Sequence, residues 1–214
     1  MNLFRRHTLA ALIACGIGSA FAAATPGKDY TAIDPPQPTD VGNKVEVIEF
    51  FSYACPHCNH LEPALEAWSA RKMPANAVLH RIPVTFGRTE WVALAKLHFA
   101  LEALGKSDEL TGKVFHAMHE EHVMLTSADT CADWAAKQGI DRAKFLDAFN
   151  SFGVQTKLQR ANMKASTYAI DGVPTLIVDG RYKTSPAMTG GNEGVLAVVD
   201  ELIQSSTKDK AAHK

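Results

Sequence analysis

The stretch that decides the fold is Glu49-Phe50-Phe51-Ser52-Tyr53-Ala54-Cys55-Pro56-His57-Cys58, in which two residues separate two cysteines. An apolar run rich in β-branched and aromatic residues, from Val45 to Phe51, leads into it and predicts a buried strand. Apolar residues at helical spacing follow the second cysteine, namely Leu61, Ala64, Leu65 and Trp68. We therefore expect the two cysteines where a strand gives way to a helix.

This position predicts a reactive dithiol, because unpaired N–H groups and the helix dipole stabilise a thiolate at a helix N-terminus. We expect Cys55 to be the exposed nucleophile and Cys58 to be the buried cysteine that resolves the mixed disulfide. Pro56 suits the first helical position, where its missing N–H costs nothing. His57 can offer the Cys55 sulfur a hydrogen bond or a positive charge, which would lower the thiol pKa. A stabilised thiolate favours the reduced protein, so the disulfide is predicted to be oxidising.

The N-terminal segment has the pattern of a secretory signal peptide. Arg5 and Arg6 precede an apolar, alanine-rich run that is too short for a membrane span. We expect cleavage after Ala24, with Ala22 as the alternative site, and a mature protein in the periplasm. The surroundings of Cys15 loosely resemble a lipoprotein processing site, and an acylated N-terminus at this cysteine would identify that alternative.

The composition is that of an ordinary soluble protein with room for one domain and an insertion: 214 residues, 46% apolar and 21% charged. The chain has 22 basic and 23 acidic residues, and loss of the two signal-peptide arginines leaves a net charge of −3. This charge gives no reason to expect a nucleic-acid partner. Three cysteines remain in the mature chain, so one lacks an internal partner. Cys131 lies on an apolar helical face and is expected to be a buried core thiol.

The remaining periodicity predicts the order of the other elements. A second strand at 78–86 follows the helix after the dithiol, so the two strands are expected to be parallel neighbours. The pattern from about 90 to 169 is helical, with four apolar faces. An antiparallel hairpin turning at Asp179-Gly180 and a helix over 192–204 are expected to complete the fold.

The dithiol stretch, together with Gly172-Val173-Pro174-Thr175 before the hairpin, resembles the thioredoxin superfamily and, within it, the DsbA family of periplasmic disulfide oxidases. The resemblance covers most of residues 40–205. It implies an α/β protein with a thioredoxin fold and an inserted all-helical subdomain. The expected divisions are a signal peptide (1–24), a first thioredoxin-like part (25–88), the helical insertion (89–165), a second thioredoxin-like part (166–205) and a flexible tail (206–214).

The resemblance also implies roles away from the dithiol. It implies a cis peptide bond between Val173 and Pro174 beside the dithiol, and a substrate-binding loop that includes Val173, Pro174 and Thr175. It further implies that Glu49, buried beneath the dithiol, assists proton transfer at the resolving cysteine, and burial would raise the pKa of this carboxyl. Arg81 matches a position where a basic residue can pair with that acid and oppose the rise.

These features predict a thiol–disulfide oxidoreductase that donates its Cys55–Cys58 disulfide to newly exported proteins through a mixed disulfide. The resemblance implies unfolded exported clients with free cysteines and a DsbB-type membrane oxidase that restores the disulfide. We expect a monomer without cofactor or metal. The alternatives are an isomerase or reductase of the same fold, a copper or zinc carrier, and a peptide-binding holdase. Equilibration with glutathione, a bound metal, or activity that survives loss of Cys55 would distinguish them.

Overall fold

The computed structural model of the chain describes residues 23–212. The charged and apolar parts of the predicted signal peptide, and Cys15 with them, lie outside the described residues. Among residues 23–212, no helix combines the length and the apolar character needed to cross a bilayer.

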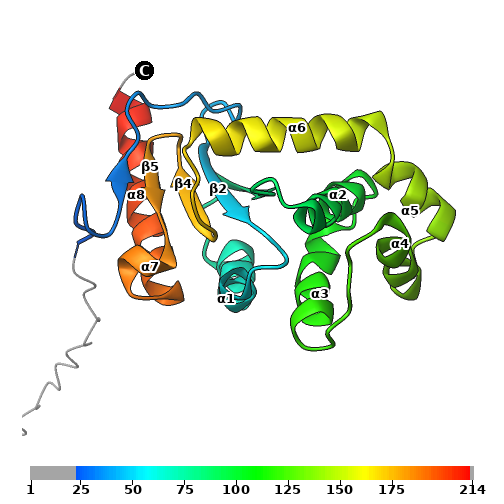
Figure 1. Cartoon of the computed structure of the whole chain (residues 1–214). Coiled ribbons are helices and arrows are strands. Elements are labelled where there is room, and N and C mark those ends of the chain that lie inside the picture. The colour runs from blue at the N-terminus through cyan, green and yellow to red at the C-terminus, as the bar shows by residue number, and fades with distance from the viewer. Residues whose placement is uncertain (1–22, 213–214) are drawn as a thin grey trace, which may run out of the picture.

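The predicted strand before the dithiol lies inside a five-stranded sheet (Figure 1). The strands are β1 (Thr31–Ala32), β2 (Val45–Phe51), β3 (Ala77–Pro83), β4 (Thr175–Val178) and β5 (Tyr182–Thr184), in the order β1-β5-β4-β2-β3. All seven residues of β2 are buried, as its apolar run predicts. β2 pairs in parallel with β3 and antiparallel with β4, which confirms the predicted parallel pair. β3 ends at Pro83, three residues earlier than predicted, since proline has no N–H for a ladder.

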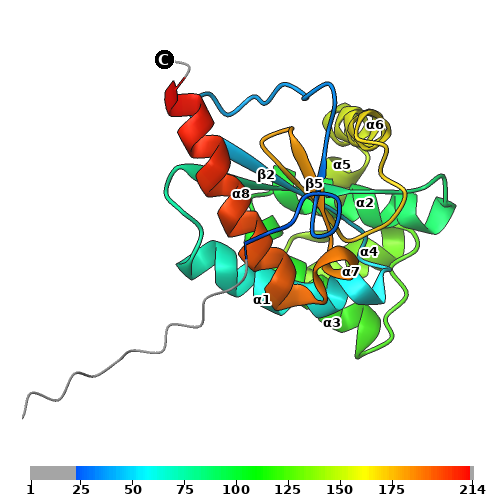
Figure 2. The ribbon, with the colours of Figure 1, turned by 90° about the vertical axis from the view of Figure 1, so that its left-hand side faces the viewer.

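Helices cover both faces of this sheet (Figure 2). On one face, α1 (Pro56–Arg71) and α8 (Asn192–Ala212) share an apolar core with β2 and β4. The indole N–H of Trp68 donates to the carboxylate of Asp200 at 2.8 Å and ties α1 to α8. On the opposite face, the end of α6 (Phe152–Thr167) packs on Ile48 and Phe50. A short helix, α7 (Pro186–Thr189), leads into α8.

The predicted helical region forms a lobe beside the sheet (Figure 1). Before α6 it contains α2 (Thr89–Ala103), α3 (Ser107–His119), α4 (Ala128–Lys137) and α5 (Arg142–Phe149). Its core is rich in leucine and phenylalanine and extends without a break to Phe51, Cys55 and Cys58. The lobe is therefore packed directly against the dithiol region.

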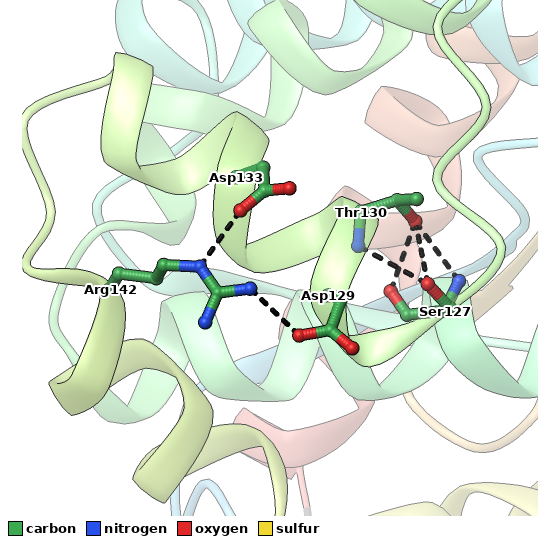
Figure 3. A network of polar contacts seen from close by, with 5 residues as sticks. All are labelled: Ser127, Asp129, Thr130, Asp133 and Arg142. Atoms are coloured by element: carbon green, nitrogen blue, oxygen red, sulfur yellow. Dashed lines mark hydrogen bonds and ion pairs between the residues drawn. The ribbon is translucent and has the colours of Figure 1, made fainter.

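Local polar contacts fix the α4–α5 corner of the lobe (Figure 3). Ser127 and Thr130 cap the start of α4 reciprocally, each side chain accepting from the other residue's backbone N–H. Arg142, at the start of α5, donates to Asp133 at 2.8 Å and to Asp129 at 2.7 Å. All of these side chains are at the surface, where they hold the corner together.

Cys131 lies inside this corner, as predicted for a core thiol. Its side chain is fully buried, and its thiol donates to the backbone oxygen of Leu125 at 3.6 Å. Burial raises the thiol pKa to about 12, so it is not a thiolate at neutral pH.

The prediction of a flexible tail from residue 206 was wrong, because α8 continues to Ala212. Ser206 is buried, and two charged residues anchor the last turns to the β4–β5 hairpin. Asp209 accepts from Arg181 at 2.6 Å, and Lys210 contacts Asp179 at 2.7 Å. Apolar periodicity does not register such long-range ion pairs, which is why the helix was predicted to end too early.

Candidate active site

The strand-to-helix junction places the two cysteines as predicted. Cys55 is the N-cap of α1, with extended backbone angles of φ −89° and ψ 117°, and Pro56 takes the first helical position. The backbone N–H of Cys55 donates to the oxygen of Ser52 at 3.0 Å, which turns the chain into the helix. The Cys55 oxygen in turn accepts from the N–H of Asn59 at 3.1 Å. The Cys55 sulfur therefore lies at the positive end of the helix dipole.

The burial of the two thiols differs from the prediction in one respect. Cys58 is fully buried, as expected of a resolving cysteine, but Cys55 is only 8% exposed. The cause lies far away in sequence, because the Cys55 sulfur lies 3.3 Å from the backbone oxygen of Val173, to which it donates when it is protonated. The side chains of Pro56 and His57 are exposed beside it. Only a small part of the attacking sulfur thus reaches solvent.

The two thiols have opposite pKa shifts. The pKa of Cys55 is lowered to about 6, mainly by a hydrogen bond from the Cys58 thiol, with further help from the N–H groups of Cys58 and His57. The charge of His57 lowers it as well, as the smallest of these contributions. Burial raises the pKa of Cys58, and the hydrogen bond that it gives to Cys55 raises it further. At neutral pH the reduced pair is one thiolate beside one thiol.

The loop before β4 lies against the dithiol. β4 pairs antiparallel with β2 with Thr175 opposite Phe50, which brings the preceding residues to the end of β2. The Val173–Pro174 peptide bond is cis, as the resemblance implied. The hydroxyl of Thr175 donates to the oxygen of Gly172 at 2.8 Å and closes this loop. The predicted loop residues are therefore brought together with Cys55.

Glu49 lies beneath the dithiol on β2. It is 1% exposed, and neither carboxylate oxygen has a hydrogen-bond partner among the described residues. The nearest cation is Arg81 on β3, whose Nε lies 3.5 Å from Oε2 of Glu49. Burial raises the pKa of Glu49; the Arg81 charge opposes the rise, and the neighbouring carboxylate of Glu62 adds to it. Burial prevails, so the carboxyl can hold a proton near neutral pH.

Sequence reasoning missed Glu62 as a member of this group. It lies on α1 one turn after Cys58, and its Oε1 is 2.8 Å from Nη1 of Arg81. Arg81 therefore bridges two buried carboxylates and lies closer to Glu62 than to Glu49. The available signal was helical phase, because Glu62 shares the buried face of α1 with Cys58 and Leu65.

Sequence reasoning also missed a polar network on Tyr53, in the loop before the dithiol. The Tyr53 hydroxyl contacts Nδ1 of His98 at 3.1 Å and the hydroxyl of Thr111 at 3.2 Å. Burial and the Arg81 charge lower the pKa of His98 to about 3, so this imidazole stays neutral. His119 donates through Nε2 to the Tyr53 backbone oxygen at 2.8 Å. The helical lobe thereby fixes the loop that carries Cys55.

The sequence also matches a known protein family. The model described as the DSBA-like thioredoxin domain matches residues 69–202. The chain belongs to the DsbA-like thioredoxin family. It is 42% identical to the thiol:disulfide interchange protein DsbA of Burkholderia cepacia, over 90% of this chain and 93% of that protein. The thiol:disulfide interchange protein DsbA of Bordetella pertussis is 44% identical, over 94% of this chain and 96% of that protein.

Solved DsbA structures have the same fold. A crystal structure of Pseudomonas aeruginosa DsbA matches with a TM-score of 0.82 at 36% identity, covering 89% of this chain and 97% of that one. The crystal structure of reduced DsbA1 from Neisseria meningitidis matches with a TM-score of 0.78 at 31% identity, covering 89% of this chain and 99% of that one. These matches confirm the predicted thioredoxin fold with helical insertion. The chain is a protein disulfide oxidoreductase of the DsbA type.

Proposed function

We propose that this DsbA-family protein acts in the periplasm as a disulfide oxidase that transfers its Cys55–Cys58 disulfide to newly exported proteins. The observation that carries the proposal is the position of the two thiols, because Cys55 is the N-cap of α1 and Cys58 is fully buried one turn inside that helix. These positions lower the pKa of Cys55 and raise the pKa of Cys58. A low-pKa cysteine is a good leaving group and stabilises the reduced state, so the disulfide tends to be passed on.

The reaction moves two electrons from the client dithiol to the disulfide of the protein. A client thiolate attacks the Cys55 sulfur, the Cys55–Cys58 bond breaks, and Cys58 leaves as a thiolate. Because Glu49 lies beneath the dithiol with a raised pKa, it is positioned to supply the proton that Cys58 takes up. A second client thiolate then attacks the client sulfur of the mixed disulfide, and Cys55 leaves as a thiolate. The client is oxidised to a disulfide and the protein is reduced to a dithiol.

The loop at Val173, Pro174 and Thr175 is the proposed client-binding element. Its contact with the Cys55 sulfur through the Val173 oxygen supports this role, because a client segment that pairs with the loop would lie beside the attacked atom. Reoxidation by a DsbB-type membrane oxidase would use the same two sulfur atoms in reverse.

The direct test mixes the oxidised protein with an equal amount of a reduced, unfolded protein that has two cysteines. We expect one disulfide to pass to the client for each molecule of the protein, with the Cys55–Cys58 pair recovered as thiols. Reduction of a client disulfide by the dithiol form under the same conditions would instead assign the reductase alternative.

Glu49→Gln is expected to slow disulfide transfer by at least about tenfold, because the amide cannot deliver a proton to Cys58. The same variant should be more stable than the parent at pH 7. Burial raises the pKa of Glu49 above its unfolded value. The parent therefore loses stability as pH rises from the unfolded-state pKa of Glu49 to its folded-state pKa, and the glutamine variant does not. Stopped-flow transfer rates and thermal unfolding from pH 4 to 8 measure both effects.

Glu66→Gln is the matched control for this experiment. Glu66 is exposed on α1, whereas Glu49 is buried on β2, so the substitution should not change the transfer rate. Equal rates for Glu49→Gln and Glu66→Gln would remove Glu49 from the mechanism.

The N-terminus of the exported protein is expected to be Ala23, which corresponds to cleavage after Ala22. The N–H of Ala24 donates to the carboxylate of Glu201 at 2.8 Å, and the N–H of Thr25 donates to Asp29 at 2.9 Å. Cleavage after Ala22 keeps both peptide groups, whereas cleavage after Ala24 removes the first contact. Intact mass and N-terminal sequencing of the exported protein test this, and a chain that starts at Thr25 would contradict it.

A further inference from the structure

His98 is a buried imidazole that the disulfide reaction does not use. It lies on α2 and is 4% exposed. Its Nδ1 lies 3.1 Å from the hydroxyl of Tyr53, and the ring also hydrogen-bonds the backbone of Arg81. The imidazole therefore connects the loop before the dithiol with β3. Because its pKa of about 3 keeps it neutral at neutral pH, it acts through these hydrogen bonds and not through charge.

The bond from His98 to the backbone of Arg81 runs outward from the sheet. It favours the protonated ring, so the ring donates through Nε2 and the Arg81 oxygen accepts, which leaves Nδ1 as the acceptor. The ladder to β2 uses the even-numbered residues of β3, as the bonds of Asn76 and Val84 at its two ends show. Backbone groups alternate along a strand, so those of Arg81 point away from β2. His98 thus holds the Arg81 peptide on the side opposite to Glu49.

Aromatic packing fixes the direction of this bond. The ring centroid of His98 lies 5.2 Å from that of Phe51, 5.5 Å from that of Phe99 and 6.0 Å from that of Tyr53. All three of these side chains are buried. The imidazole therefore cannot turn away from β3 without displacing a buried ring.

The guanidinium of Arg81 stops short of Glu49. Its Nε lies 3.5 Å from Oε2 of Glu49, whereas its Nη1 lies 2.8 Å from Oε1 of Glu62. Neither oxygen of Glu49 has a hydrogen-bond partner among the described residues, so this carboxylate would gain from a closer guanidinium. The titratable groups that face Glu49 include a single cation: Arg81 from β3, Glu62 and Cys58 from α1, and Tyr53 from the loop before the dithiol. The separation must therefore be held from the Arg81 side.

We propose that His98 is a positioning residue that keeps the guanidinium of Arg81 short of Glu49 through its bond to the Arg81 backbone. Two anchors then hold Arg81, with Glu62 on its side chain and His98 on its main chain. Loss of the backbone anchor lets the guanidinium close to the 2.8 Å that it keeps to Glu62. At an effective dielectric constant of about 20, this approach favours the ionised form of Glu49 by about tenfold.

The consequence for disulfide transfer rests on the proposed function, in which Glu49 gives Cys58 a proton. A carboxyl that a close cation keeps ionised has no proton to give. The bond from α2 to Arg81 thus keeps the carboxyl beneath the dithiol able to take up a proton. In this way the helical lobe sets the proton supply of a dithiol that it does not carry.

Three substitutions separate the two bonds of His98. In His98→Gln the amide N–H can take the place of Nε2 and keep the bond to Arg81. In His98→Asn the shorter side chain can offer an oxygen in place of Nδ1 and keeps only the bond to Tyr53. His98→Leu removes both bonds, and the Tyr53 hydroxyl retains its contact with Thr111 at 3.2 Å. His116→Gln, on the exposed surface of α3, is the matched control.

The measurement is a carbon-13 NMR titration of the glutamate carboxyls in the oxidised mature protein, which has no thiol beside Glu49. Glu49→Gln and Glu62→Gln assign the two signals. In His98→Asn and His98→Leu the midpoint of Glu49 should fall by about one pH unit, while that of Glu62 stays or rises. In His98→Gln and in the control, both midpoints should match the parent. Water that enters a loosened core would instead lower both midpoints, because burial raises the pKa of both carboxyls.

Disulfide transfer over the same pH range is the second readout. At the pH where half of the parent's Glu49 is protonated, His98→Asn should transfer about fivefold more slowly than the parent, and His98→Gln should match the parent. A shifted Glu49 midpoint without a change in rate would support the positioning of Arg81 and count against Glu49 as the proton donor. The inference itself would be overturned by an unchanged Glu49 midpoint in both His98→Asn and His98→Leu, by a fall of both midpoints together, or by equal shifts in His98→Gln and His98→Asn.

Discussion

Replacing Cys55 with serine is expected to reduce disulfide transfer to the uncatalysed rate, because the sulfur that clients attack is lost. Replacing Cys58 with serine should have a different consequence. Cys55 keeps the helix N-terminus that stabilises its thiolate, so it can still attack a client disulfide, which forms a mixed disulfide and releases the other client cysteine as a thiolate. Without Cys58 nothing within the protein can displace the client, and the mixed disulfide should accumulate. An oxidation assay on a reduced client measures the first outcome. Non-reducing gels of Cys58→Ser mixed with a disulfide-bonded client measure the second.

Cys131→Ser is the matched control for these variants. Cys131 is fully buried and its thiol pKa is raised to about 12, so it cannot take part in exchange at neutral pH. The variant should transfer disulfides at the parent rate once its fold has been verified. Activity that survives Cys55→Ser would favour the peptide-binding holdase, and loss of activity in folded Cys131→Ser would assign a role to the third thiol.

The reduced protein is expected to become more stable relative to the oxidised protein as pH rises. The pKa of the Cys55 thiol is lowered to about 6 in the fold, against about 8.5 in an unfolded chain. For a lowered pKa, the stabilisation is complete above the unfolded value and is lost as pH falls through the folded value. Only the reduced form has this thiol. The raised pKa of Cys58 opposes this gain near pH 9, so the advantage of the reduced form should grow by about 2 kcal/mol between pH 6 and pH 9.

Thermal unfolding of the two forms across this pH range is the measurement. For a chain of this size the change corresponds to a gain of roughly 5–10 °C in the Tm difference between the forms. The disulfide itself closes a loop of only four residues, so the cross-link adds less to the oxidised form than a longer loop would. A Tm difference that does not change with pH would mean that Cys55 is not a thiolate in the folded state.

The local features of the site were predictable from the sequence because they depend on neighbouring residues. The strand before the dithiol, the helix that starts at Pro56 and the hairpin after Pro174 follow from apolar spacing and turn residues. The burial of Cys58 follows from its place one turn inside that helix. The cis bond before Pro174 came from the resemblance alone, because nothing in local spacing distinguishes cis from trans.

The remaining features depend on contacts between distant parts of the chain. The oxygen of Val173 covers the Cys55 sulfur across 118 residues, so the exposure of the nucleophile was predicted too high. Arg81 was recognised as a possible partner of Glu49, but its shorter contact with Glu62 depends on how α1 packs against β3. The partnership of Tyr53 with His98 likewise requires the helical lobe to be docked on the sheet.

The central claim is that the Cys55–Cys58 disulfide is a donor. Its most direct test is the equilibrium of this pair with reduced and oxidised glutathione at pH 7, followed by the thiol content of the protein. The lowered pKa of Cys55 predicts that the equilibrium favours the reduced protein, with a potential more oxidising than the roughly −270 mV of thioredoxin. A potential near the roughly −270 mV of thioredoxin would contradict the claim and make the protein a reductase.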